Sequence, residues 1–421
     1  MLKLKKSLFY QTLFFACVAT PYLAIYELTF FVWALTATIT LKNKYSLTIL
    51  QYVSCFIAIF SAAVIVAIAR DKFMLYNFLR DVAYMLKPIL GLLIGYQLCK
   101  DYIKKPFLFI INTGIIIAIL HFVAIGYSVV VHKITDMHKL REYSGYFSDF
   151  EVYAIIVLLF HKQLGCEVSR QKYRAGLLLL ALSIIFYFAR TNFIQFVILY
   201  LALKGYFVIN KRSVIVISTF MLVVLGGYAA IYSYNPKRGA RGVEALLYKI
   251  KIAPTEPFKT KIDIDDWKEF NDNYRSYETI LTLRQVPKGG ASAVIFGEGM
   301  GSSIDLKREV WLQTSFMRYI PFLHNGFMTV YLKSGLLGVC ILLYSISLFF
   351  RNKKSDIPIV QNINYILLGT GIYLIMSYWV FMGLYFVADT KSIVIGFIIC
   401  YREVLIKQHK IKQAVVRQPI V

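Results

Sequence analysis

The sequence offers few residues that could bind a metal or form a cross-link. It has only six cysteines in 421 residues. No two of them lie at the short separation of a zinc site, and all are expected in membrane spans or inner loops. Histidine is equally scarce, with six residues. We therefore expect no metal, no cofactor and no disulfide in the outer part of the chain. The cysteines are Cys17, Cys55, Cys99, Cys166, Cys340 and Cys400.

Acidic residues are also few, with 23 Asp and Glu against 47 Lys and Arg, a formal net charge of +24. Such a charge could indicate nucleic-acid binding. However, 58% of the residues are hydrophobic and 16% aromatic, and the mean hydropathy is +0.61. These values lie far from those of a soluble globular protein. The composition predicts an all-α, polytopic integral membrane protein, whose basic residues belong in cytoplasmic loops.

Twelve apolar stretches are candidate membrane spans. A hydrocarbon core about 30 Å thick takes roughly 20 residues per helix. With the N-terminus inside, every inner connection is basic, as the positive-inside rule requires, so we expect no nucleic-acid partner. The amphipathic stretch 70–81 is expected to lie flat at the outer interface. The spans lie near residues 8–24, 26–41, 46–69, 82–99, 106–131, 149–163, 173–189, 192–209, 213–233, 326–350, 361–383 and 386–406.

One outer connection, residues 234–323, is far longer than a loop needs to be, and we call it the outer segment. Loops of this length are usually functional, so it is the expected catalytic or binding part. It divides the chain into 1–233 with nine spans, 234–323, and 324–421 with three spans and a cytoplasmic tail. Inside it, the second half of the stretch that ends before Pro287 predicts an amphipathic helix, and "VIFGEGMG" at 294–301 predicts an apolar strand or a turn that closes on glycines. "DIDD" at 263–266 is interpreted as a solvated turn or helix cap.

Four outer-facing motifs follow one another along the chain. "LREYSGYFSD" at 140–149 leads into a span, and "FARTN" at 188–192 places Arg190 at a helix turn. Arg284 then precedes the glycines of "GEGMG", and His324 with Asn325 stands ahead of "SGLLG". Each motif alone is weak. Arginine at a helix end can simply reach lipid phosphate, and histidine there can be an interfacial side chain.

The order of these motifs resembles the superfamily of bacterial O-antigen polymerases (Wzy type) and O-antigen ligases (WaaL type). The resemblance covers roughly residues 140–340 by motif and the whole chain by topology. It implies a metal-independent membrane glycosyltransferase of the GT-C type in the bacterial inner membrane, with its active site facing the periplasm. It also implies undecaprenyl-pyrophosphate-linked oligosaccharides as donor and acceptor, contact with membrane lipid, and a chain-length regulator protein as a partner.

Residue roles follow from this resemblance and from the chemistry of the side chains. Guanidinium groups suit a pyrophosphate leaving group because they stay charged and donate in parallel. His324, Arg284 and Arg190 are therefore the expected catalytic residues, with His324 as the base for the acceptor hydroxyl. Glu142 and Asp149 are rival bases that the sequence cannot rank against it. The expected substrate-binding residues are Arg141, Glu142, Asp149, Asn325 and Arg318.

Two other functions stay open. An O-antigen ligase would use the same donor and transfer the glycan to the lipid A core. A flippase or transporter would carry ionisable residues near the membrane midplane and broken helices. The predicted spans are almost uncharged at their centres, which favours an enzyme over a transporter. A polymerase is favoured over a ligase because the ligase-like signature is diverged.

Overall fold

The computed structural model describes residues 2–416, apart from positions 72, 104, 135, 146–147, 209, 241–242, 257–258, 313–314 and 352–353. These residues form helices and one antiparallel two-stranded sheet. The helices are α1 (Leu2–Ala19), α2 (Tyr26–Ile39), α3 (Leu47–Arg70), α4 (Leu75–Tyr102), α5 (Pro106–Val130), α6 (Met137–Ser144), α7 (Asp149–Leu159), α8 (Arg170–Phe186), α9 (Arg190–Leu203), α10 (Lys211–Tyr234), α11 (Val243–Ile252), α12 (Trp267–Asp272), α13 (Tyr274–Gln285), α14 (Ala291–Phe296), α15 (Gly326–Ser347), α16 (Pro358–Val380) and α17 (Lys391–Val416). The strands are β1 (Ile304–Leu312) and β2 (Ser315–Ile320).

In the described part of the chain, six helices are long and apolar enough to cross a membrane, namely α3, α4, α5, α10, α15 and α16. They confirm the prediction of a mainly helical, multi-pass membrane protein. The other six predicted spans also correspond to helices, but α2, α7, α8 and α9 have only 11 to 17 residues. The number of twelve crossings stays a prediction.

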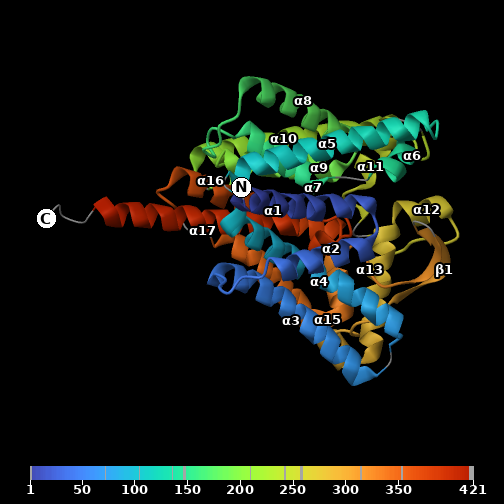
Figure 1. Cartoon of the computed structure of the whole chain (residues 1–421). Helices are drawn as coiled ribbons and strands as arrows, with labels where there is room; N and C mark the ends of the chain where they lie inside the picture. The colour runs from blue at the N-terminus through green and yellow to red at the C-terminus, as the bar shows by residue number, and fades with distance from the viewer. Residues whose placement is uncertain are drawn as a thin grey trace.

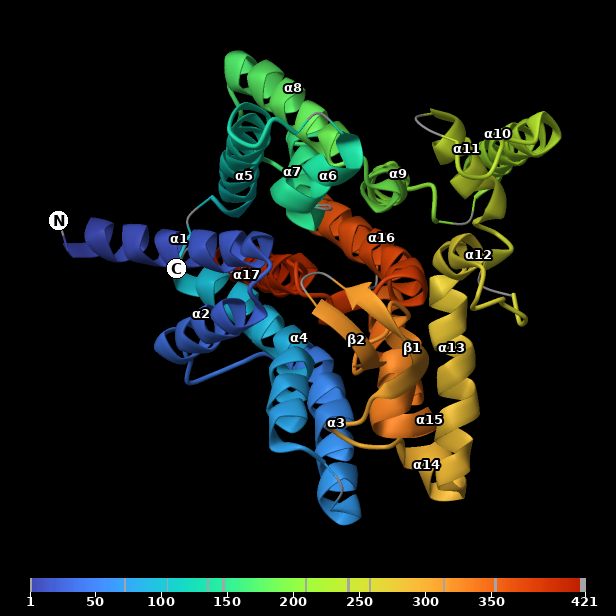
Figure 2. The ribbon, with the colours of Figure 1, turned by 90° about the vertical axis from the view of Figure 1, so that its right-hand side faces the viewer.

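The centre of the bundle is the close packing of α4 against α17 (Figure 1). A Cβ atom at Gly95 of α4 would lie 2.0 Å from the carbonyl oxygen of Ile393, and one at Gly396 would lie 2.0 Å from that of Leu92. Small residues permit helix backbones to approach this closely. At the other extreme, the apolar window of α10 buries none of its residues. Figure 2 shows α10 with α11, apart from the central helices.

The amphipathic stretch 70–81 does not form a separate interfacial helix. α3 ends at Arg70, and α4 begins at Leu75 and continues to Tyr102, so residues 75–81 are the first turns of α4. Asp81 is fully buried there. The prediction of an interfacial helix was wrong because it assumed that the charged residues face water. The sequence pattern does not show that the Asp81 carboxylate pairs with Lys333 inside the protein.

The outer segment folds onto the beginning of α15, at the end of the molecule opposite the C-terminus (Figure 1). α12, α13, α14, β1 and β2 surround a small core of its own. The hydroxyl of Tyr277 donates to the carbonyl oxygen of Leu306 at 2.9 Å and so fixes α13 to β1. The two strands are an exception to the all-α prediction. The core contains Phe270, Tyr277, Val286, Ile304, Leu306, Ile320, Leu323 and Leu332.

The glycine-rich loop of the outer segment fits into a break in α15. Ser334 and Gly335 have non-helical backbones, and Gly335 has a φ of +62°. The N–H groups of Glu298 and Gly299 donate to the carbonyl oxygens that precede the break, at 2.7 and 3.1 Å. A Cβ atom at Gly335 would lie 2.3 Å from the carbonyl oxygen of Ile295. "GEGMG" is therefore the expected turn and not a strand, because 294–296 belong to α14.

Candidate functional site

His324 lies directly before α15, where the outer segment meets the bundle. Asn325 is the N-cap of this helix, and its side-chain oxygen accepts a hydrogen bond from the N–H of Met328 at 3.2 Å. The hydroxyl of Thr329 accepts a hydrogen bond from the N–H of Leu323 at 3.0 Å. Asparagine is among the best N-caps because its side chain satisfies a free N–H of the first turn. The backbone around His324 is therefore held from both sides.

Glu278 of α13 is the partner of His324. Its carboxylate is fully buried and accepts the backbone N–H of His324 at 2.8 Å. The imidazole Nδ1 lies 3.1 Å from each carboxylate oxygen. Because a carboxylate is an acceptor, Nδ1 of the neutral ring carries the hydrogen and Nε2 keeps its lone pair. The side chain of His324 is 41% exposed, so the ring is accessible although its partner is not.

The position of this carboxylate is also electrostatically favourable. It lies at the N-terminus of α15, where the helix dipole stabilises negative charge. The ring of Tyr274 meets the imidazole edge to face, with 5.5 Å between centroids. Burial and the charge of Glu278 raise the pKa of the Tyr274 hydroxyl. Tyr274 thus stays a neutral phenol beside the imidazole.

The residues on either side of His324 alternate between buried and accessible. Leu323 and Asn325 are buried, whereas Phe322 and His324 are partly exposed. Phe322 stacks on Tyr84 of α4, with 4.3 Å between ring centroids. An aromatic contact between the outer segment and α4 is therefore made by a residue two positions before His324 in the chain.

The predicted arginines lie on separate elements of the structure. Arg190 begins α9, and its guanidinium donates to the carbonyl oxygen of Lys249 in α11 at 3.3 Å. Arg284 is exposed in the last turn of α13. Arg318 of β2 forms a two-pronged ion pair with Asp305 of β1, at 2.7 and 2.9 Å, and so joins the two strands. Only Arg284 shares a helix with Glu278.

The motif at 140–149 is divided between two places. Arg141 and Glu142 lie in α6, and the side chain of Glu142 falls outside what the structure describes. Asp149 begins α7 and is fully buried, with one carboxylate oxygen 2.7 Å from the ammonium of Lys391. Lys391 also contacts Asp389 at 2.6 Å. Asp149 is therefore part of an ion-pair cluster in the bundle and is separate from His324.

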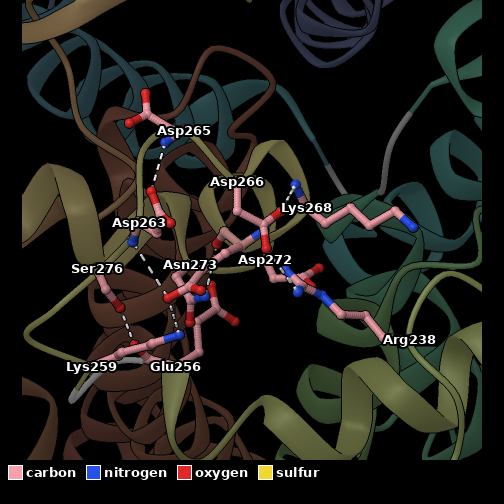
Figure 3. A network of polar contacts seen from close by, with 11 residues as sticks. Arg238, Glu256, Lys259, Asp263, Asp265, Asp266, Lys268, Asp272, Asn273 and Ser276 are labelled. Atoms are coloured by element: carbon pink, nitrogen blue, oxygen red, sulfur yellow. Dashed lines mark hydrogen bonds and ion pairs between the residues drawn. The ribbon is translucent and has the colours of Figure 1, made fainter.

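A network of charges covers α12 and the start of α13 (Figure 3). Asp266 caps α12 by accepting the N–H groups of Lys268 and Glu269, at 2.8 and 3.1 Å. Its other oxygen contacts Arg238 at 3.2 Å. Asp263 accepts the N–H of Asp265 at 2.9 Å. "DIDD" thus forms the turn and helix cap that were predicted, and no group of three or more potential metal ligands occurs within the described residues.

Two charged residues that the structure places at this site were missed from the sequence. Glu278 is the buried partner of His324, and Arg275 lies three residues before it on the same helix. The only indication of these two residues in the sequence was their spacing, because they lie about one turn apart on the amphipathic helix predicted before Pro287.

No family model matches the sequence, and a search of curated proteins found no match. The function is therefore inferred from the geometry.

Proposed function

We propose that the chain is an O-antigen, or surface polysaccharide, polymerase. It would join undecaprenyl-pyrophosphate-linked repeat units at the periplasmic face by metal-independent, inverting glycosyl transfer. The observation that carries this proposal is the accessible imidazole of His324, oriented by the buried carboxylate of Glu278. A histidine with its Nδ1 hydrogen held by a carboxylate is a common arrangement of a general base.

The proposed chemistry is one displacement. His324 Nε2 accepts the proton of an acceptor hydroxyl while that oxygen forms a bond to the anomeric carbon of the donor sugar. The bond between this carbon and the diphosphate oxygen breaks, and the diphosphate leaves with the electron pair. Fixed cations stabilise the charge that develops on it. Arg190 and Arg284 are the cations to which the family resemblance gives this role.

A transporter has one specific observation in its favour. Contrary to the expectation of uncharged spans, the bundle contains the Asp149, Lys391 and Asp389 cluster and the buried Lys87 of α4. The ammonium of Lys87 donates to the carbonyl oxygen of Phe386 at 2.6 Å. Buried ionisable residues often mark ion pathways. However, the two carboxylates and the two ammonium groups balance in charge, and such a balance is equally expected of an ion cluster that only stabilises the fold.

The test uses the purified full chain in nanodiscs with a lipid-pyrophosphate-linked repeat unit. The wild type should give a ladder of longer glycans, and chelator should leave its rate unchanged. His324→Ala should lower turnover by about 10² to 10⁴-fold. Glu278→Gln should lower kcat with little change in KM, because the base remains and only its orientation is lost, and Glu278→Asp should recover part of the rate.

The matched control is His132→Ala, which removes an exposed imidazole from the predicted outer side and should keep full activity. A fully active His324→Ala variant would contradict the proposed role of the base. A single transfer onto lipid A core, without a ladder, would instead support the ligase. Absence of glycan transfer, together with uptake of substrate by proteoliposomes, would support the transporter.

A further inference from the structure

Glu151, in the first turn of α7, is a buried acid that the proposed glycosyl transfer does not use. Its side chain is fully buried in the bundle. One carboxyl oxygen, Oε1, accepts a hydrogen bond from the hydroxyl of Tyr187 at 3.0 Å. The other oxygen, Oε2, is buried and has no hydrogen-bond partner in the described part of the chain. Nearly all buried polar atoms in proteins are hydrogen-bonded, so this oxygen requires an explanation.

The partner of Glu151 connects it to a buried histidine. The imidazole of His121 in α5 stacks on the ring of Tyr187, with 3.7 Å between centroids. Its Nδ1 lies 2.8 Å from the hydroxyl of Ser183, which is four residues before Tyr187 on α8. The Nε2 of His121 is also buried without a partner among the described residues. An acid and a base, each with one unused atom, are thus joined through Tyr187 where α5, α7 and α8 meet.

No positive charge compensates a carboxylate at this position. Within the described residues, Glu151 forms no ion pair with a lysine, arginine or histidine. Lys391 of α17, which also packs against α7, contacts Asp149 at 2.7 Å and Asp389 at 2.6 Å. Arg190 of α9 donates to a carbonyl oxygen of α11. The N-terminus of α7 supplies only about half a positive charge. An ionised Glu151 would therefore add a third carboxylate to a cluster that is already balanced.

A proton explains both the missing counter-charge and the unused oxygen. A buried carboxylate without a cation is costly, and such a group is neutralised instead. A metal cation would require several oxygen ligands, and no group of three or more potential metal ligands occurs in the described chain. A proton needs only one oxygen. Protonated Glu151 carries the hydrogen on Oε2, and Oε1 stays the acceptor for Tyr187.

We propose that Glu151 is a proton-binding site that holds one proton at neutral pH where α5, α7 and α8 meet. Buried ionisable residues in membrane bundles often belong to proton relays. Tyr187 ends α8 three residues before Arg190 begins α9. Loss of the proton would thus place a negative charge beside the turn that leads to Arg190. The site does not rest on the proposed function, because its evidence is the burial and the contacts of Glu151 alone.

The test is infrared difference spectroscopy of the full chain in nanodiscs at neutral pH. The wild type minus Glu151→Gln spectrum should contain the carbonyl stretch of a protonated carboxyl group, which an ionised carboxylate lacks. Tyr187→Phe gives a second readout that leaves Glu151 in place. Its carboxyl band should lie at higher frequency, because the hydroxyl that donates to the carbonyl oxygen is gone. Glu309→Gln, a change at an exposed carboxylate of β1, is the matched control and should leave this band unchanged.

Thermal unfolding measures the same proton through its effect on stability. Above about pH 4.3 the unfolded chain releases the proton of Glu151, whereas the folded protein keeps it. Folding then takes up a proton, so the thermal midpoint of the wild type should fall relative to that of Glu151→Gln as the pH rises. Sodium chloride and choline chloride should give the same midpoint, because the ligand is a proton.

Three results would overturn the site. One is the absence of the carboxyl band from the wild type minus Glu151→Gln spectrum, which would mean that Glu151 is ionised or that His121 carries the proton. Another is a wild type that gains stability relative to Glu151→Gln as the pH rises. The third is a midpoint that sodium raises in the wild type only, which would replace the proton by a metal cation. The carboxyl band in a protein without glycan transfer would keep the site and reject only the polymerase.

Discussion

Removal of the Lys333 ammonium should destabilise the protein in a way that the structure allows us to size. Lys333 of α15 and Asp81 of α4 are both fully buried and ion-paired, and the same ammonium donates to the carbonyl oxygen of Ser302. Asp81 also accepts the N–H of Gly301 at 2.7 Å. The pair thus connects α4, α15 and the glycine-rich loop. Breaking a buried ion pair on one side typically costs about 3 to 5 kcal/mol, because the remaining charge is left without its partner.

The two single variants should differ in magnitude. In Lys333→Met, Asp81 keeps the N–H of Gly301 and a 3.4 Å contact with Arg80, so we expect the lower value, about 3 kcal/mol. In Asp81→Asn, the ammonium of Lys333 stays buried without a counter-charge, and we expect about 5 kcal/mol. For a chain of this length these values correspond to a fall in Tm of about 3 to 6 °C.

The measurement is thermal unfolding of the full chain in nanodiscs, followed by circular dichroism. The double variant Lys333→Met with Asp81→Leu should lose less than the sum of the single changes, since it leaves no buried charge from the pair. Lys268→Met, the same change at an exposed lysine, should alter stability by no more than about 0.5 kcal/mol. Single variants as stable as Lys268→Met, or additive effects in the double variant, would refute the reasoning.

Two further predictions concern pH and topology. Arg318 holds the pKa of the Asp305 carboxyl below its ordinary value. The ion pair therefore stabilises the fold fully at pH values above the ordinary carboxyl pKa of about 3.9. This stabilisation is lost as the pH falls through the lower pKa of the folded state. The thermal midpoint of the wild type should therefore fall more steeply than that of Asp305→Asn between about pH 5 and pH 2; parallel curves would contradict this. In a background without the six native cysteines, Lys288→Cys should react with an impermeant thiol reagent from outside, and Ser355→Cys should not. Labelling of Ser355→Cys from outside would reject the predicted orientation.

The ends of the helices that flank the outer segment could be read from hydropathy, while the internal structure of this segment was only partly predictable. α10 ends at Tyr234 and α15 begins at Gly326, close to the limits 234 and 323 that the hydropathy gave. The amphipathic helix before Pro287 is α13. The hairpin was missed, and the sequence left open whether "VIFGEGMG" forms a strand or a turn, because the conformation of a short apolar run depends on what packs against it. Here the break in α15 receives the loop.

The candidate site was likewise predictable only in part. His324 and Asn325 were singled out because a polar pair is unusual at the start of an apolar helix, and both lie at the N-terminus of α15. Arg318 was taken for a substrate contact, but its guanidinium is engaged by Asp305 across the hairpin. Arg284 was grouped with Arg190 because the family resemblance and the chemistry of the guanidinium group give both a role at the leaving group. The structure places them on different helices, α13 and α9, and their relative position could not be read from sequence spacing because it depends on how these helices pack.

The sequence by itself determined the class of the protein, the approximate location of the membrane helices and the existence of one large segment outside them. These properties follow from local composition, because the length of an apolar run and the charge of a short loop need no partner. The tertiary structure alone decided which charges meet. Lys333 and Asp81 are 252 residues apart, Lys391 and Asp149 are 242 apart, and His324 and Glu278 are 46 apart. No local pattern encodes such pairs, since a buried charge is tolerated only where folding brings a distant partner within hydrogen-bonding distance.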